Sequence, residues 1–173
     1  MKVIQRILTL GFVLFLLGST AFTQTEDEYW GTWNKNYPEV EILTILAAEK
    51  KYADSIEKNP KIPPYYVRTG KYRFEGEYLA ETRKIDTAVL SSVKRVHAWF
   101  GGDPKQIDKL IKSEVLFKVG ENKLWMPVQQ NILKAIKEEA VKGDKLMLYC
   151  AFFNEHTSRK KLFNSLLISE FSK

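Results

Sequence analysis

The feature that most constrains this fold is an uninterrupted apolar run near the end of the chain. Residues 146–153 are eight consecutive apolar side chains, with Cys150 in their middle. Successive side chains of a strand point to opposite faces, so such a strand has to be covered on both of them. The run therefore predicts a central strand of a sheet, with other elements packed on each side.

Other segments have the pattern of strands. Between Tyr72 and Leu79, aromatic residues alternate with mostly charged ones, as on a strand with one buried face. Thr69-Gly70 predicts a turn between this strand and the strand-like residues 65–67, and Gly76 is the point where a bulge is easiest. The remaining predicted strands are a hairpin formed by residues 115–119 and 123–126, and a closing strand at 162–171.

Four segments have the three- and four-residue spacing of apolar side chains that indicates amphipathic helices. Asp86 or Thr87 is expected to cap the second, and Asp103-Pro104 to open the third. The aromatic-rich segment 26–38 has no clear period, so we expect it to be irregular. The predicted helices are residues 39–57, residues 86–100, a short helix after Asp103-Pro104, and residues 127–141.

These elements predict a single α+β domain over residues 24–173. It would contain a mostly antiparallel sheet of five to six strands and about four helices. Two arrangements of the sheet fit the pattern about equally. One is a small partly closed barrel, and the other is an open antiparallel sheet with helices on one face.

The first 23 residues have the three-part pattern of a secretory signal peptide. Lys2 and Arg6 precede an apolar run over residues 7–17, and small and polar residues follow. The apolar run is shorter than the roughly 20 residues that span a bilayer. We therefore expect cleavage after Ala21 or Thr23, contact with the membrane only during export, and a periplasmic or extracellular location.

The charge balance argues against nucleic acid as a partner. The full chain has 27 Lys and Arg against 21 Asp and Glu, a net charge of +6, and removal of Lys2 and Arg6 with the signal leaves +4. That mild excess is typical of a soluble surface, not of a nucleic-acid footprint. One Cys and two His are too few for the usual zinc centres, and we predict no metal or other cofactor.

One stretch of the chain resembles a known group of proteins. Leu124-Trp125-Met126-Pro127-Val128-Gln129 is followed after one helix by Gly143-Asp144-Lys145-Leu146-Met147-Leu148-Tyr149. This segment resembles one found in small, uncharacterised exported bacterial proteins. The shared pattern is a W-x-P-V-Q stretch, a helix, a G-D pair and an apolar strand. The resemblance covers residues 124–149 and implies no activity, cofactor or catalytic residue.

Few side chains are candidates for catalysis. We expect Cys150 to be an inert core residue, because burial raises the pKa of a thiol, and His97 to be structural. His156 and Arg159 fall in a polar segment, residues 154–161, that we expect to form a loop, and loops often carry binding residues. The alternating strand carries Glu75, Glu77 and Glu81. Next-but-one residues of a strand are about 7 Å apart, a separation that glycosidases use for their paired carboxylates. We nevertheless expect these glutamates to form a water-facing strand surface.

Aromatic residues are the other excess of this sequence. Trp30, Trp33 and Tyr37 lie in the N-terminal aromatic segment, where exposed rings would bind a glycan or a protein partner. The sequence thus favours an exported cell-envelope protein that is a non-catalytic binding or structural module. The alternative is a small envelope hydrolase that uses His156 with a nearby carboxylate.

Overall fold

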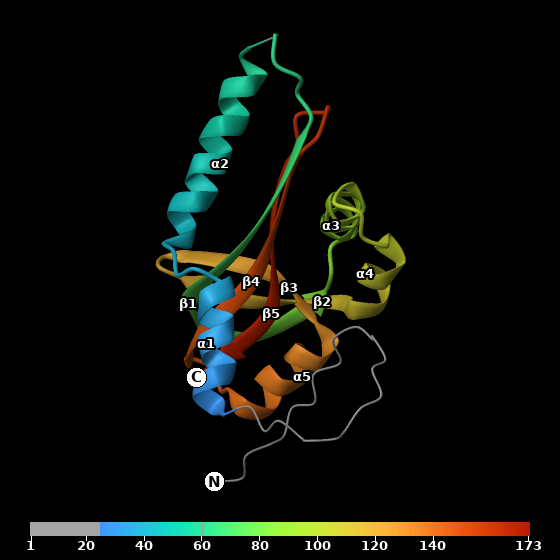
Figure 1. Ribbon diagram of the computed structural model, residues 1–173. Coiled ribbons are helices and arrows are strands. Elements are labelled where there is room, and N and C mark those ends of the chain that lie inside the picture. The colour runs from blue at the N-terminus through green and yellow to red at the C-terminus, as the bar shows by residue number, and fades with distance from the viewer. Residues whose placement is uncertain (1–24, 60) are drawn as a thin grey trace.

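The computed structural model describes residues 25–59 and 61–173 of this protein, and the predicted signal peptide lies outside them. The described part contains five helices and five strands (Figure 1). No helix in these two ranges is both long and apolar enough to cross a membrane. The helices are α1 (Glu26–Asn36), α2 (Ile42–Glu57), α3 (Thr87–Trp99), α4 (Pro104–Leu110) and α5 (Gln130–Glu139). The strands are β1 (Tyr66–Lys84), β2 (Ile111–Val119), β3 (Asn122–Gln129), β4 (Lys145–His156) and β5 (Leu162–Ser172).

The five strands follow one another in a closed ring, in the order β1-β2-β3-β5-β4. Every pairing is antiparallel except that of β3 with β5, which consists of one parallel pair, Val128 with Ile168. The predicted α+β fold and the mostly antiparallel sheet are confirmed, and the ring is closer to the partly closed arrangement than to the open sheet. The long strands β1, β4 and β5 extend upward from the ring between α2 and α3 (Figure 1).

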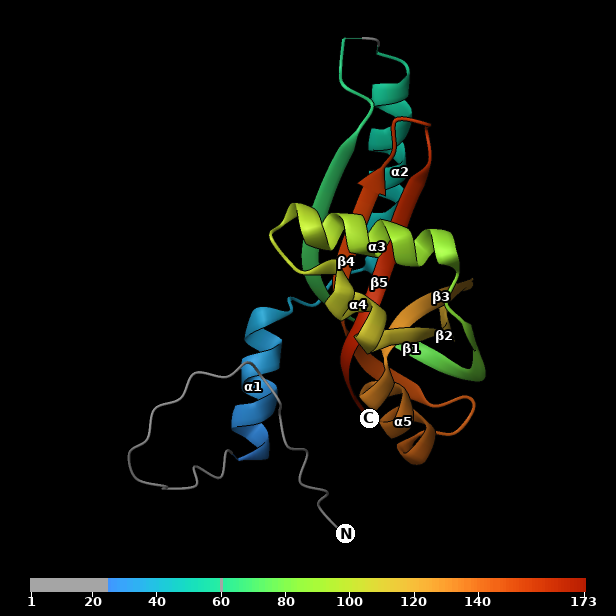
Figure 2. The ribbon, with the colours of Figure 1, turned by 90° about the vertical axis from the view of Figure 1, so that its right-hand side faces the viewer.

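The apolar run of β4 supplies both hydrophobic cores of the molecule. On one face, Leu146, Leu148, Cys150 and Phe152 enter the larger core together with residues of every other strand, α2 and α5. On the other face, Phe153 joins a smaller core with residues of α3 and α4. Figure 2 shows α3 lying across β4 and β5. The prediction of a strand covered on both faces is therefore confirmed.

Strand β1 is one continuous element, so the predicted turn at Thr69-Gly70 is wrong. Gly70 pairs with Phe152 in the ladder, and a Cβ atom at Gly70 would come within 2.8 Å of the Tyr72 ring. Glycine is needed there for the close approach of that ring rather than for a turn. The register shift of β1 falls between Tyr78 and Thr82, where Ala80 has a φ of 58°, and not at the expected Gly76.

Two of the predicted helices begin where their capping residues indicate. Asp86 accepts hydrogen bonds from the first turn of α3, and Asp103 caps α4 with Pro104 at its first position. Helix α5 begins later than predicted, because Pro127 belongs to β3, where it pairs with Glu114. Proline is tolerated at that position because β3 pairs with its other neighbour, β5, only at Val128.

The aromatic segment that we expected to be irregular is helix α1. Thr25 caps it with a capping box, in which the Thr25 hydroxyl accepts from the Glu28 amide and the Glu28 carboxylate accepts from the Thr25 amide. The helix has no fully buried residue of its own. It is therefore held by the contacts of its aromatic rings with the sheet.

Candidate functional site

The aromatic residues predicted as a binding surface gather around one tyrosine of the sheet. The Trp30 ring stacks on Tyr149 of β4 with 5.6 Å between ring centroids, and the Trp33 ring meets the same tyrosine edge-on at 5.6 Å. Tyr37 is buried beside them, and the Tyr149 hydroxyl donates to the Asn34 side chain at 2.9 Å. Because both tryptophans are half-buried against Tyr149, these rings attach α1 to β4.

His156 lies at the end of β4 and not in a loop, so that part of the prediction is wrong. Its ring is fully buried and stacks on Tyr66, with 5.4 Å between the ring centroids. Nε2 lies 2.8 Å from a carboxylate oxygen of Glu57, and Nδ1 contacts the carbonyl oxygen of Pro64. Both ring nitrogens are thus engaged, and His156 ties the end of α2 and the following loop to the sheet.

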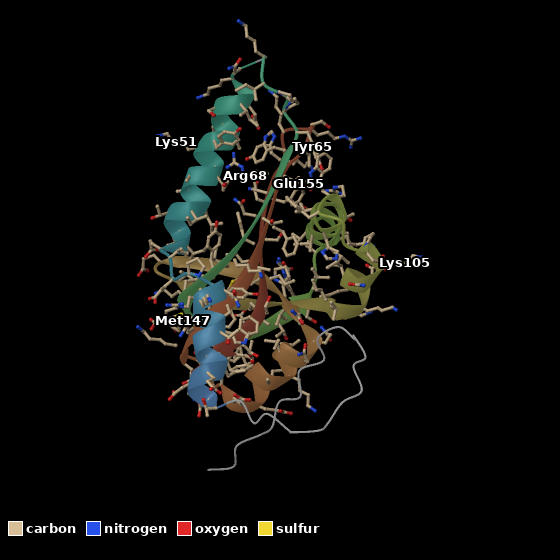
Figure 3. All side chains as sticks on the ribbon, in the orientation of Figure 1. Lys51, Tyr65, Arg68, Lys105, Met147 and Glu155 are labelled. Atoms are coloured by element: carbon tan, nitrogen blue, oxygen red, sulfur yellow. The ribbon has the colours of Figure 1, made fainter. Side chains whose placement is uncertain are left out.

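The neighbouring residue, Glu155, points to the opposite face of β4. Its carboxylate is 1% exposed and accepts two hydrogen bonds of 2.7 Å from Nε and Nη2 of Arg95 on α3. This two-pronged geometry is the strongest kind of ion pair that side chains form. Figure 3 shows Glu155 of β4 near Tyr65, the residue that precedes β1.

Glu155 and Arg95 form one side of a surface pocket of about 460 Å³. The volume is within the range of pockets that bind small molecules. The turn between β4 and β5 forms the other side of the pocket. Thr157 stabilises this turn through backbone hydrogen bonds with Lys160 and Lys161, and its hydroxyl accepts a further hydrogen bond from the Lys161 amide. The residues lining the pocket are Tyr65, Arg95, Glu155, Thr157, Ser158, Arg159, Lys161 and Phe163.

The pocket has an excess of positive charge. Arg95, Arg159 and Lys161 are cationic and Glu155 is the one carboxylate of the lining, which leaves a net charge of +2. Glu155 is already bound to Arg95, whereas neither Arg159 nor Lys161 has an ion-pair partner among the described residues. The hydrogen bonds to Glu155 raise the pKa of Arg95 above its usual value, so this side chain stays charged.

Hydrogen-bond donors surround these charges. Burial, followed by the nearby charge of Glu155, raises the pKa of Tyr65, so its hydroxyl stays protonated at neutral pH. Thr157 and Ser158 add two more hydroxyls to the lining. The arrangement can therefore hold a negatively charged group and several polar atoms beside it.

Of the predicted site residues, the structure brings only Arg159 to this pocket. Sequence reasoning placed Glu155 and Lys161 in one polar segment with Arg159, but it did not separate Glu155 from His156 and it missed Arg95. The signal lay in the strand period: once β4 continues to residue 156, Glu155 and His156 must face opposite sides. No such pattern in the sequence indicates that α3 packs against β4, so the part that Arg95 plays in the site is visible only in the structure.

The other candidates for chemistry have structural positions. Cys150 is fully buried, and that burial raises the pKa of its thiol, as expected for a core residue. Glu75 binds Lys145 of the neighbouring strand at 2.8 Å, and the register shift after Tyr78 interrupts the alternation before Glu81. Across residues 25–59 and 61–173, no group of three or more His, Cys, Asp and Glu side chains is arranged to hold a metal ion.

The segment that resembles uncharacterised exported proteins forms β3, α5 and the first half of β4. Its Trp125 lies under the guanidinium of Arg83, 4.3 Å from the ring centroid, and Met126 and Val128 enter the larger core. These positions are structural. Comparisons with protein-family models, curated proteins and solved structures found no match for this chain.

Proposed function

We propose that this protein is an exported binding module of the bacterial cell envelope, without catalytic activity, and that its ligand is negatively charged. The observation that carries the proposal is the convergence of Arg95, Arg159 and Lys161 on one pocket whose single carboxylate is already paired. Export rests on the signal-like residues 1–23.

The chemistry of the lining favours binding over catalysis. Its groups are guanidinium, ammonium and hydroxyl donors, which hold an anion in place. The carboxylate of Glu155 is buried and occupied by Arg95, so it is poorly placed to accept a proton from a substrate. His156, the residue on which the hydrolase alternative depends, lies on the other face of β4 with both ring nitrogens engaged.

A thermal-shift titration with citrate tests the proposal. Citrate is added at constant ionic strength, so that screening by salt does not change during the titration. A ligand that binds only the native state raises the melting temperature in proportion to the logarithm of its concentration once the site is saturated. We expect such a rise with citrate and none with uncharged glycerol at the same concentrations.

Two double variants with the same loss of charge assign the effect to the pocket. Arg159→Ala/Lys161→Ala removes two cations from the pocket, and both side chains are exposed. Lys50→Ala/Lys51→Ala removes two exposed cations from α2, and Figure 3 shows Lys51 on the far side of α2 from Tyr65 and Glu155. Loss of the citrate effect in the first variant alone supports the proposal, whereas an equal response in both variants contradicts it.

A further inference from the structure

We propose, on the basis of the binding function above, that the ligand is an acidic oligosaccharide and that Trp99 binds one of its sugar rings. Trp99 is the last residue of α3, and 65% of its surface is exposed. Its ring contacts Tyr65 edge-on, with 5.8 Å between the ring centroids, and Tyr65 lines the cationic pocket. An exposed indole thus lies directly beside the cationic pocket.

The two parts of this surface match the two sides of an acidic sugar. The C–H groups along one face of a sugar ring carry partial positive charge, and they pack well on the electron-rich face of an indole. A carboxylate on the next sugar would meet Arg159 and Lys161, and Arg binds carboxylates with two parallel hydrogen bonds. The hydroxyls of Tyr65, Thr157 and Ser158 are placed to bond sugar hydroxyls.

The shape of the surface favours a sugar chain over a lipid membrane. Trp99 and Phe100 project from the end of α3 and are 65% and 57% exposed, as side chains that enter a bilayer would be. The cations, however, line a surface pocket that also holds the buried carboxylate of Glu155. An oligosaccharide chain can occupy the pocket and the indole together, because Tyr65 both lines the pocket and contacts the Trp99 ring.

Calorimetric titration of the full protein with three sugars tests the inference. The probes are galacturonate, tetragalacturonate and the neutral cellotetraose, all at 0.15 M salt. We expect tetragalacturonate to bind about tenfold more tightly than galacturonate, because stacking on Trp99 adds to the contacts of the carboxylate. Cellotetraose should bind more weakly than either acidic sugar because it lacks the charge that the pocket binds.

Two neighbouring aromatic substitutions separate stacking from a general loss of apolar surface. Trp99→Ala should weaken tetragalacturonate binding by about tenfold and leave galacturonate binding within about twofold. Phe100→Ala is the matched control, because Phe100 is exposed to a similar degree one residue further on, whereas the ring contact with Tyr65 of the pocket is made by Trp99. It should leave the binding of both acidic sugars unchanged.

The outcomes distinguish this inference from the function on which it rests. If citrate stabilises the protein through Arg159 and Lys161 but Trp99→Ala leaves tetragalacturonate binding unchanged, the oligosaccharide inference is wrong and the binding function stands. If phosphatidylglycerol vesicles bind, acidic sugars do not, and Trp99→Ala and Phe100→Ala weaken vesicle binding alike, a membrane surface is the partner instead. If neither citrate nor tetragalacturonate binds, both proposals fail.

Discussion

Replacing Arg95 by methionine isolates the ion pair that forms one side of the pocket. Methionine keeps an unbranched apolar stem in place of the arginine side chain but removes both 2.7 Å hydrogen bonds to Glu155. A fully buried pair that loses one partner costs about 3–5 kcal/mol, because the remaining charge has neither water nor a counterion. Here Glu155 is 1% exposed but Arg95 is 48% exposed, so water can approach the carboxylate from that side. We expect Arg95→Met to lower the free energy of unfolding by about 2 kcal/mol, somewhat below that range.

The assay is urea unfolding at pH 7, followed by circular dichroism, of the wild type, Arg95→Met and the double variant Arg95→Met/Glu155→Met. The double variant removes the unpaired charge, so it should recover to within about 1 kcal/mol of the wild type. A double variant less stable than Arg95→Met would show that packing, and not the uncompensated charge, determines the loss.

Further predictions concern other parts of the fold. Gly102→Ala should lower the free energy of unfolding by about 1–3 kcal/mol, because the new Cβ atom would lie 2.1 Å from the His97 ring. Gly31→Ala is the contrasting helix substitution, with nothing within 4 Å, and urea unfolding should show a gain of up to about 1 kcal/mol. Hydrogen bonds from two amides of α3 lower the pKa of Asp86, so its stabilisation is present above the unfolded-state pKa and is lost as the pH falls through the lower folded-state value. The melting temperatures of wild type and Asp86→Ala should therefore converge in strong acid, and a difference that persists there would contradict this cause. Expression in a bacterium should give a secreted chain whose intact mass lacks residues 1–21 or 1–23, and an uncleaved mass would refute the signal peptide.

Much of the fold could be predicted from short-range patterns in the sequence. The apolar run of β4, the alternation in β1 and the capping residues Asp86 and Asp103 each determine their element through local backbone chemistry. Helix α1 was missed because its tryptophans are spaced for contact with Tyr149, a residue more than 100 positions away. The one local indication of this helix is the capping box at Thr25. It is easily overlooked because the aromatic residues that follow have no helical period.

The candidate site was harder to predict than the fold. Its charged groups come from α3 and from the turn between β4 and β5, and nothing in the spacing of Arg95 and Arg159 indicates that they meet. The polar side chains from Asn154 onward predict a loop, so the strand expected from the sequence ends at Phe153. In the structure Asn154, Glu155 and His156 are all buried within the strand. Partners from α2, α3 and β5 compensate that burial, and such partners cannot be read from one segment.

The two consecutive residues at the end of β4 give the molecule a mechanical connection between its opposite sides. Glu155 binds α3 through Arg95, and His156 binds α2 through Glu57, with the strand between the two helices (Figure 1). The side chains on either side of a single peptide unit therefore anchor two helices to the same strand end. An anion that draws Arg95 away from Glu155 would loosen the strand end on which α2 depends. Amide protons near the end of α2 should accordingly exchange faster with solvent when an anion occupies the pocket on the opposite side of the sheet.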